Sequence, residues 1–203
     1  MTDKDCDYSH LKLELKSQLT SISENINSIV SSLDQDKTCL LNDMERISKH
    51  LSNIGALAST YYLSCFLAPY TNKYEEISQA IFRLSSKRQG ALMVIQRKDP
   101  IDAWITPGIP LSAEITSSLM ESIFVPGSPL HDGAVLIRYD ILVSAANILP
   151  LTDKSYGQQK IGTRHRAAIG MSERTDALIL VVSEETGKAS FGLNGTLYPF
   201  TPA

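Results

Sequence analysis

The stretch GTRHRAAIGMSE, from Gly162 to Glu173, decides how the rest of the chain is interpreted. A Gly-Thr pair followed by alanines and other good helix formers predicts a helix that begins near Thr163. Arg164, His165 and Arg166 then fall in its first turn, where the positive end of the helix dipole disfavours cations. A bound anion would resolve this conflict, and phosphate, held by backbone N–H groups and guanidinium groups, is the expected one. A solvated basic helix end is the alternative, but apolar residues flank the turn on both sides.

A second polar cluster, His131-Asp132-Gly133, stands immediately before the apolar run AVLIRY. An Asp-Gly pair before a strand is usually a turn, so a purely structural role remains open. The same residues suit catalysis, because Asp132 can bind a divalent metal or accept a proton from a hydroxyl group. Gly133 would let a ligand approach the backbone, and His131 is a candidate second metal ligand.

A third cluster, Ser183-Glu184-Glu185, directly follows the apolar run ALILVVS. Carboxylates at the carboxyl end of a central strand lie where α/β sheets usually bind ligands, although an exposed acidic turn is an open alternative. Together the clusters offer cations for phosphates, carboxylates for a metal and glycines for close approach, a combination typical of phosphoryl or nucleotidyl transfer. The chain has no GxxxxGK[ST] or GxGxxG motif, which excludes the P-loop and dinucleotide-binding classes.

The apolar pattern around these clusters predicts an α/β fold, with a mixed β-sheet flanked by helices. The sheet is expected to be mixed because tight hairpins give antiparallel pairs and crossovers give parallel ones. The predicted strands and hairpins cover residues 91–97, 134–149, 177–183 and 188–200, the last with Asn194-Gly195 as its turn. The predicted helices cover residues 74–86, residues 113–124 with Ser112 as N-cap, and a segment from Thr163.

The first third of the chain carries apolar residues at alternating spacings of three and four, the pattern of a heptad stripe on a helix. One stripe consists of Leu15, Leu19, Ile22, Ile26, Ile29 and Leu33, and a second of Leu40, Met44, Ile47, Leu51 and Ile54. Asp36 is a candidate cap between them. We therefore expect an N-terminal antiparallel helical hairpin over residues 1–69, ahead of the α/β domain over residues 70–203. Whether the hairpin serves oligomerisation or regulation, or is a decoration, stays open.

Composition and charge indicate which partners and which cellular compartment to expect. The net charge of −3 gives no global attraction to nucleic acid. The uncharged window over residues 55–70 is too short and too rich in hydroxyl groups for a membrane span, so we expect it in a core or an interface. The three cysteines are odd in number and widely spaced, and we expect free thiols in a reducing, cytoplasmic compartment.

The segments PLHDGAVLI, GTRHRAAIG and VVSEETG occur in the order seen in a known family. The Asp-Gly-Ala and Arg-His-Arg pair resembles the signature of the diadenylate cyclase (DAC) domain, which would occupy about residues 70–203. This resemblance implies a DAC-type fold that uses Mg²⁺ or Mn²⁺ to condense two ATP molecules into the second messenger cyclic di-AMP, with release of two pyrophosphates. The arrangement is most similar to the small Bacillus type with an N-terminal helical hairpin, associated with sporulation.

The resemblance also implies roles for individual residues. Asp132 would bind the catalytic metal and help deprotonate the attacking 3′-hydroxyl, with Gly133 close to the nucleotide. Leu149 would pack on adenine, and Ile148 stands where the family often has an aromatic residue. The expected phosphate-binding residues are Thr163, Arg164, His165, Arg166, Ser183 and Glu184, of which Arg164 and Arg166 are also expected to be catalytic; Glu185 is a candidate metal contact.

Each DAC domain holds one ATP, so the resemblance implies a homo-oligomer whose catalytic domains face each other, with a hexamer as one option. No nucleic acid partner is expected. An alternative is an oligomer that binds ATP or cyclic di-AMP without turnover and acts as a regulator, and a third interpretation is a structural oligomer with a vestigial site.

Overall fold

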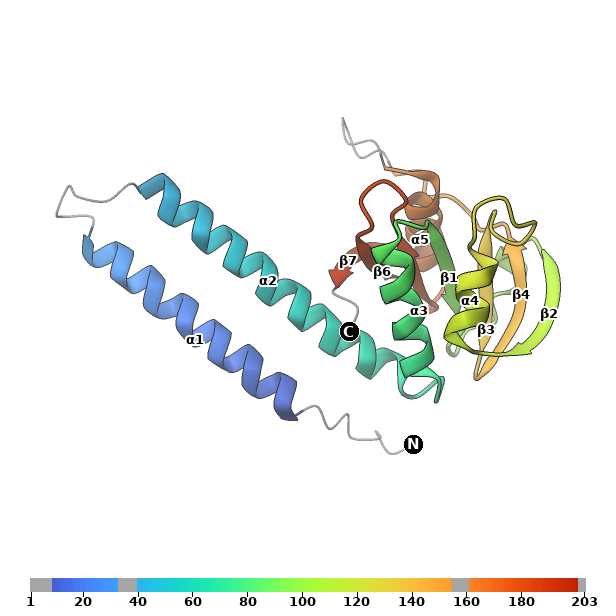
Figure 1. Cartoon of the computed structure of the whole chain (residues 1–203), viewed down its shortest axis with the longest axis horizontal. Coiled ribbons are helices and arrows are strands. Elements are labelled where there is room, and N and C mark those ends of the chain that lie inside the picture. The colour runs from blue at the N-terminus through green and yellow to red at the C-terminus, as the bar shows by residue number, and fades with distance from the viewer. Residues whose placement is uncertain (1–8, 33–39, 155–160, 201–203) are drawn as a thin grey trace.

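The computed structural model describes residues 9–32, 40–154 and 161–200. Two long helices, α1 (Ser9–Ser32) and α2 (Leu40–Leu67), lie side by side and extend away from the rest of the molecule (Figure 1). They run antiparallel, and the imidazole Nε2 of His50 lies 2.7 Å from the Gln18 side-chain oxygen across the pair. The predicted N-terminal helices are thus confirmed, whereas the predicted cap Asp36 and Leu33 lie outside the described residues.

The two heptad stripes are only half used within this pair. Ile22, Ile29 and Ile54 are buried between the helices. The intervening stripe positions are exposed by 43 to 55 per cent of their surface, namely Leu19, Ile26, Met44 and Leu51. A single hairpin therefore leaves an apolar stripe uncovered on each helix.

The last turns of α2 pack into the core of the α/β domain. Leu63 and Leu67 are at most 2 per cent exposed, and the Phe66 and Phe191 rings lie 6.4 Å apart. The Arg97 guanidinium lies 5.6 Å from the Phe66 ring and 5.0 Å from the Tyr70 ring, a cation–π arrangement. The second half of the apolar window thus packs in a core, one of the two places expected for it.

One expectation about this region is wrong. Cys65 is disulfide-bonded rather than a free thiol. Its partner lies outside the described residues. The odd number and wide spacing of the cysteines gave no signal for a pair.

A seven-stranded sheet forms the centre of the domain, in the order β2-β4-β3-β1-β5-β6-β7. β1 and β3 run parallel, and the other neighbouring pairs are antiparallel, which confirms the predicted mixed sheet. The strands are β1 (Ala91–Ile95), β2 (Ile109–Glu114), β3 (Ala134–Arg138), β4 (Ile141–Asn147), β5 (Leu178–Val182), β6 (Ala189–Leu193) and β7 (Thr196–Phe200).

Helices cover both faces of the sheet (Figure 1). On one face α3 (Tyr74–Ser86), α4 (Ser117–Ile123) and the end of α2 bury residues such as Ile81 and Met120. On the other face α5 (Thr163–Arg174) buries Ala168 and Met171 against the sheet. The predicted helices at residues 74–86 and from Thr163 are confirmed.

The helix predicted over residues 113–124 is wrong in its first part. Residues up to Glu114 form β2, and α4 begins only at Ser117. Its cap is Thr116, whose hydroxyl accepts the Leu119 N–H at 3.2 Å, rather than Ser112. β2 escaped prediction because it is an edge strand, which tolerates Pro110 and lacks the apolar alternation of a central strand.

The topology brings the three polar clusters together at one end of the central strands. β1 and β3 are parallel, so the loops that precede them lie together. β4 and β5 run antiparallel to these strands, with Asn147 opposite Ala134 and Val182 opposite Ala91. The residues before β1 and β3 therefore meet those after β4 and β5.

Candidate active site

A cavity of about 1390 Å³ opens at this end of the central strands. Most of the residues predicted from the sequence line it together, although they come from four separate segments: the three polar clusters and the residues after β4. They are Asp132, Gly133, Leu149, Thr163, Arg164, His165, Ser183, Glu184 and Glu185. The convergence supports one shared site rather than three independent turns.

Two predicted residues do not line the cavity. Arg166 projects toward the loop before α5, where its Nη2 donates to the Thr152 carbonyl at 3.3 Å. The His131 Nδ1 lies 2.5 Å from the Ser128 carbonyl. The structure therefore does not bring the Arg166 guanidinium or the His131 imidazole to the other predicted residues.

The Asp132 carboxylate is exposed and makes no hydrogen bond or ion pair within the described part of the chain. Gly133, beside it, has a φ of +125°, in the region that favours glycine. A Cβ at Gly133 would lie 2.7 Å from the Ala146 carbonyl carbon and 2.8 Å from the Asn147 oxygen. The turn thus needs glycine for space as well as for conformation, and it leaves Asp132 free to bind a metal or a hydroxyl group.

Arg164 connects the helix turn to the Asp132 loop. Its Nη1 lies 3.1 Å from a Glu184 carboxylate oxygen, and its Nη2 donates to the His131 carbonyl at 3.4 Å. The guanidinium passes over Gly90, where a Cβ would lie 2.6 Å from Nη1. Because Glu184 is largely exposed, this ion pair contributes little to stability and leaves the guanidinium available to a phosphate.

Gly90→Ala is a direct test of this placement. The new methyl group meets the far end of a flexible side chain, so we expect it to displace the Arg164 guanidinium without unfolding the domain. The KM for ATP should rise about tenfold, the loss expected for one charge-assisted hydrogen bond. Gly55→Ala, which adds a methyl group with no atom within 4 Å, is the control. An unchanged KM in Gly90→Ala would show that the position of Arg164 is unimportant.

His165, in the first turn of α5, is half-buried beside the acidic turn. Burial lowers the pKa of His165, and the negative charge of Glu185 offsets this only in part. The imidazole is therefore mainly neutral near pH 7, and it does not add a third permanent cation to the first turn. This removes part of the electrostatic conflict inferred from the sequence.

The lowered pKa of His165 predicts a pH-dependent affinity. A bound triphosphate favours the imidazolium form, so ATP binding should take up a proton, and affinity should rise as the pH falls through and below the usual histidine value of 6.5. Calorimetry in buffers of different ionisation enthalpy measures the uptake. His165→Gln should abolish this part of the pH dependence while leaving that of ATP itself. The same proton uptake in wild type and variant would contradict the assignment.

Aliphatic side chains form another part of the cavity lining, the aliphatic wall, which includes Ile148 and Leu149. Leu149 is 5 per cent exposed, whereas Ile148 is 66 per cent exposed at the rim. Among the described lining residues there is no phenylalanine, tyrosine or tryptophan. A base bound here would make aliphatic contacts without aromatic stacking.

Ile148→Tyr should therefore strengthen nucleotide binding. The position is exposed, so the larger side chain fits without a packing cost. Stacking on a base contributes about 1–3 kcal/mol, so we expect the KM for ATP to fall about tenfold. Ile148→Leu, of the same size as the natural residue, is the control. A base held far from this wall would leave the KM unchanged in both variants.

The donor set of the cavity suits a divalent metal only in part. Asp132 and Glu185 both line it. No group of three or more His, Cys, Asp or Glu side chains placed to hold a metal occurs among the described residues. This fits Mg²⁺ or Mn²⁺ that takes one or two carboxylates from the protein and its remaining ligands from substrate phosphates and water.

The cavity also contains residues that the sequence did not single out. Lys188, just after the acidic turn, adds a cation to the wall, and Asn147 ends β4 beneath the Asp132 loop. Lys188 could have been noticed as a basic residue close to Glu185. Asn147 carried no such signal, because it lies within an apolar run and its importance depends on the neighbouring strands.

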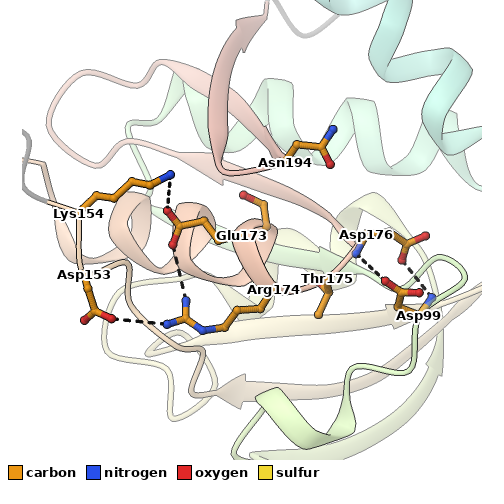
Figure 2. Close-up of a pocket in the computed structure, with 9 residues that line it drawn as sticks. Asp99, Asp153, Lys154, Glu173, Arg174, Thr175, Asp176 and Asn194 are labelled. Atoms are coloured by element: carbon orange, nitrogen blue, oxygen red, sulfur yellow. Dashed lines mark hydrogen bonds and ion pairs between the residues drawn. The ribbon is translucent and has the colours of Figure 1, made fainter.

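A second cavity, of about 680 Å³, lies at the other end of α5 (Figure 2). Its charged groups are paired with one another. Glu173 contacts Lys154 at 3.0 Å and Arg174 at 3.6 Å, and the backbone N–H groups of Asp99 and Asp176 each donate to the other's carboxylate. Burial raises the pKa of Glu173, but the hydrogen bonds from Lys154 and the Thr152 hydroxyl, together with nearby positive charge, outweigh it, and the pKa lies below its usual value. This network joins loops of the fold.

Family models match most of the chain. Residues 78–197 match the DAC family, described as "DisA bacterial checkpoint controller nucleotide-binding", and residues 2–70 match "Diadenylate cyclase CdaS, N-terminal". The chain is 48% identical to the diadenylate cyclase CdaS of Bacillus thuringiensis, over 93% of this chain and 94% of the relative. It is 47% identical to the cyclic di-AMP synthase CdaS of Bacillus subtilis, over 93% and 90%.

Two solved structures are also similar to this chain, both in fold and in sequence. A crystal structure of a hypothetical membrane spanning protein from Bacillus cereus superposes with a TM-score of 0.83 at 47% identity, covering 95% of both chains. DacA from Staphylococcus aureus, a double mutant, gives 0.60 at 38% identity, over 63% of this chain and 85% of that one. In the described part of the present chain, every helix is too short or too polar to cross a membrane.

Proposed function

The chain belongs to the DAC-domain family of diadenylate cyclases, and we propose that two copies of it, facing each other, condense two ATP molecules into cyclic di-AMP and two pyrophosphates. One observation carries the proposal: Asp132, the Arg164 turn and Glu184 line a single cavity, with Arg164 joined to both other segments. A carboxylate for the nucleophile and a cation for the phosphates thus lie on one wall.

In the proposed reaction the 3′-hydroxyl oxygen of one ATP attacks the α-phosphorus of the other. The new O–P bond forms as the bond to the bridging oxygen of pyrophosphate breaks, and the hydroxyl proton passes to the Asp132 carboxylate. Arg164 and the N–H groups at the start of α5 would bind the triphosphate and stabilise the charge of the leaving pyrophosphate. A second, identical step closes the ring.

We assign the divalent metal to Asp132 and Glu185, with substrate phosphates as further ligands. Mg²⁺ or Mn²⁺ bound there would supply Lewis-acid stabilisation of the α-phosphoryl charge. We assign the adenine to the aliphatic wall at Leu149, and the phosphates to Thr163, Ser183 and their neighbours, because all of these residues line one cavity.

The reaction joins two ATP molecules, and the described residues of one chain form one such cavity, so two active sites would have to face each other. We propose that residues 1–69 serve assembly, with residues 70–203 as the catalytic domain. The exposed stripe positions, such as Leu19 and Leu51, support this because a second hairpin would cover them. With ATP as substrate, we place the protein in the cytoplasm.

The first test is incubation of the pure protein with ATP and Mn²⁺, with separation of the nucleotides by chromatography. Cyclic di-AMP and pyrophosphate in a 1:2 ratio are expected. An oligomer that binds ATP or cyclic di-AMP without turnover would protect against thermal unfolding and give no product, which separates the two functions.

Subunit mixing tests the facing arrangement. Wild type is allowed to exchange subunits with an equal amount of Asp132→Asn protein. If both members of a pair must be intact, random pairing leaves about a quarter of the pairs able to make cyclic product. The mixed pairs, about half of the total, should accumulate the linear dinucleotide with a single new bond. A loss of only half the rate, without a linear product, would contradict the facing arrangement.

Deletion of residues 1–60 tests the role of the hairpin, because it leaves Leu63 and Leu67 in the core. A regulatory or assembly role predicts a changed oligomeric state together with changed cyclase activity. A decoration would leave both as they are.

A further inference from the structure

Asn147, the last residue of β4, is a polar side chain with almost no exposure. Only 1 per cent of its surface is accessible, although it lies at the floor of the cavity. Burial of an amide is unfavourable unless its polar atoms are hydrogen-bonded. Its contacts therefore indicate what the residue does.

The two ends of the amide bind three different parts of the chain. Nδ2 donates to the Ala134 carbonyl at 2.7 Å. Oδ1 accepts from the Gly108 N–H at 3.0 Å and from the Ser144 hydroxyl at 2.9 Å. Ala134 comes directly after Asp132-Gly133, so the amide anchors the backbone on which the Asp132 loop turns.

The main chain around Asn147 packs closely against the same loop. The carbonyl oxygen of Asn147 lies 2.8 Å from the position of a Cβ at Gly133. Ala146, just before it, has a φ of +56°, an unfavourable conformation for a residue with a side chain. A strained residue kept in place by its surroundings is a feature of functional sites.

Asn147 is also joined to the base-binding wall. Ile148 follows it in the chain and pairs with Thr106 through two backbone hydrogen bonds of 3.0 and 3.1 Å. Gly108, two residues after Thr106, is held by the Asn147 side chain. One amide thus sets the distance between the Asp132 loop and the wall expected to hold adenine.

We propose that Asn147 is a positioning residue, which fixes the Asp132-Gly133 turn relative to the base-binding wall and thereby places the Asp132 carboxylate for the metal and the 3′-hydroxyl. This inference rests on the proposed function for the chemistry of Asp132. It assigns to Asn147 no contact with the reacting atoms.

Asn147→Ser tests the proposal, because serine is too short to reach both Ala134 and Gly108 and leaves room for water. We expect kcat to fall about tenfold or more at saturating ATP, since a small misplacement of a catalytic group has effects of this size. The KM for ATP should change less than about twofold, because the phosphate-binding turn is intact. Asn147→Ala serves if the serine variant does not fold.

A second measurement does not depend on turnover. Free Mn²⁺ is followed by electron paramagnetic resonance as it binds to the protein with a non-hydrolysable ATP analogue. Asn147→Ser should weaken Mn²⁺ binding several-fold. Asp132→Asn should weaken it more, and addition of Asn147→Ser to Asp132→Asn should have no further effect, because Asn147 acts through Asp132.

Ser144→Ala is the matched control, because it removes a hydrogen bond to the same Asn147 oxygen and leaves the bond to Ala134 intact. It should keep wild-type kcat and Mn²⁺ affinity. If Asn147→Ser lowers only the melting temperature, with kcat and Mn²⁺ affinity unchanged, the residue is structural and the proposal is overturned. An inactive wild type that still binds Mn²⁺ in an Asn147-dependent manner would instead overturn the proposed function alone.

Discussion

Asp132→Asn is expected to lower the rate of cyclic di-AMP formation on the order of 10³-fold, the size of effect associated with loss of a general base. The substitution keeps the shape of the side chain and removes its charge. Asp132 makes no hydrogen bond or ion pair within the described part of the chain, so stability should be unaffected. The loss should therefore appear in kcat, while ATP binding, which depends on the turn at α5, is largely retained.

The measurement combines a steady-state assay with calorimetric titration of ATP. Glu184→Gln is a useful comparison. Glu184 lines the same cavity as Asp132, but its carboxylate forms an ion pair with Arg164. The substitution should alter ATP affinity more than turnover. A normal rate in Asp132→Asn would refute both the metal role and the base role of this residue.

Much of the fold could be predicted because the apolar pattern and the turn residues agreed with each other. Helix α3, the strand β1 and the Asn194-Gly195 hairpin followed from local signals, and the last has the two left-handed residues of its turn type. The β3–β4 hairpin was also predicted, although its turn uses Tyr139 at a φ of +53° in place of glycine or asparagine. β2 was missed because an edge strand pairs on one side and needs no distinctive pattern.

The candidate site was predictable as a set of residue types and only partly as a geometry. Charge and spacing at residues 131–133, 162–166 and 183–185 indicated phosphate chemistry, and the antiparallel course of β5 explains why these segments meet. The sequence could not distinguish Arg164 from Arg166, because which side chain faces the cavity depends on how α5 packs. Asn147 could not be identified for a related reason, since two of its three hydrogen-bond partners are 13 and 39 residues away in the chain.

The difference between the two arginines gives the second large effect. Arg164 lines the cavity, whereas Arg166 donates to the Thr152 carbonyl outside it. Arg164→Ala should raise the KM for ATP about 10²-fold, because charge-assisted hydrogen bonds to phosphate contribute about 1.5–3 kcal/mol each. Arg164→Lys should restore only part of the affinity, since an ammonium group lacks the planar fork that binds two oxygens.

Arg166→Ala is the matched control. It replaces the same type of residue in the same turn of α5 and causes the same change of charge. If each nucleotide is bound within one chain, this variant should raise the KM much less than Arg164→Ala. An equally severe loss in Arg166→Ala would contradict this assignment. It would mean that Arg166 gives up its bond to the Thr152 carbonyl and contacts a bound nucleotide, in its own cavity or in that of the facing chain.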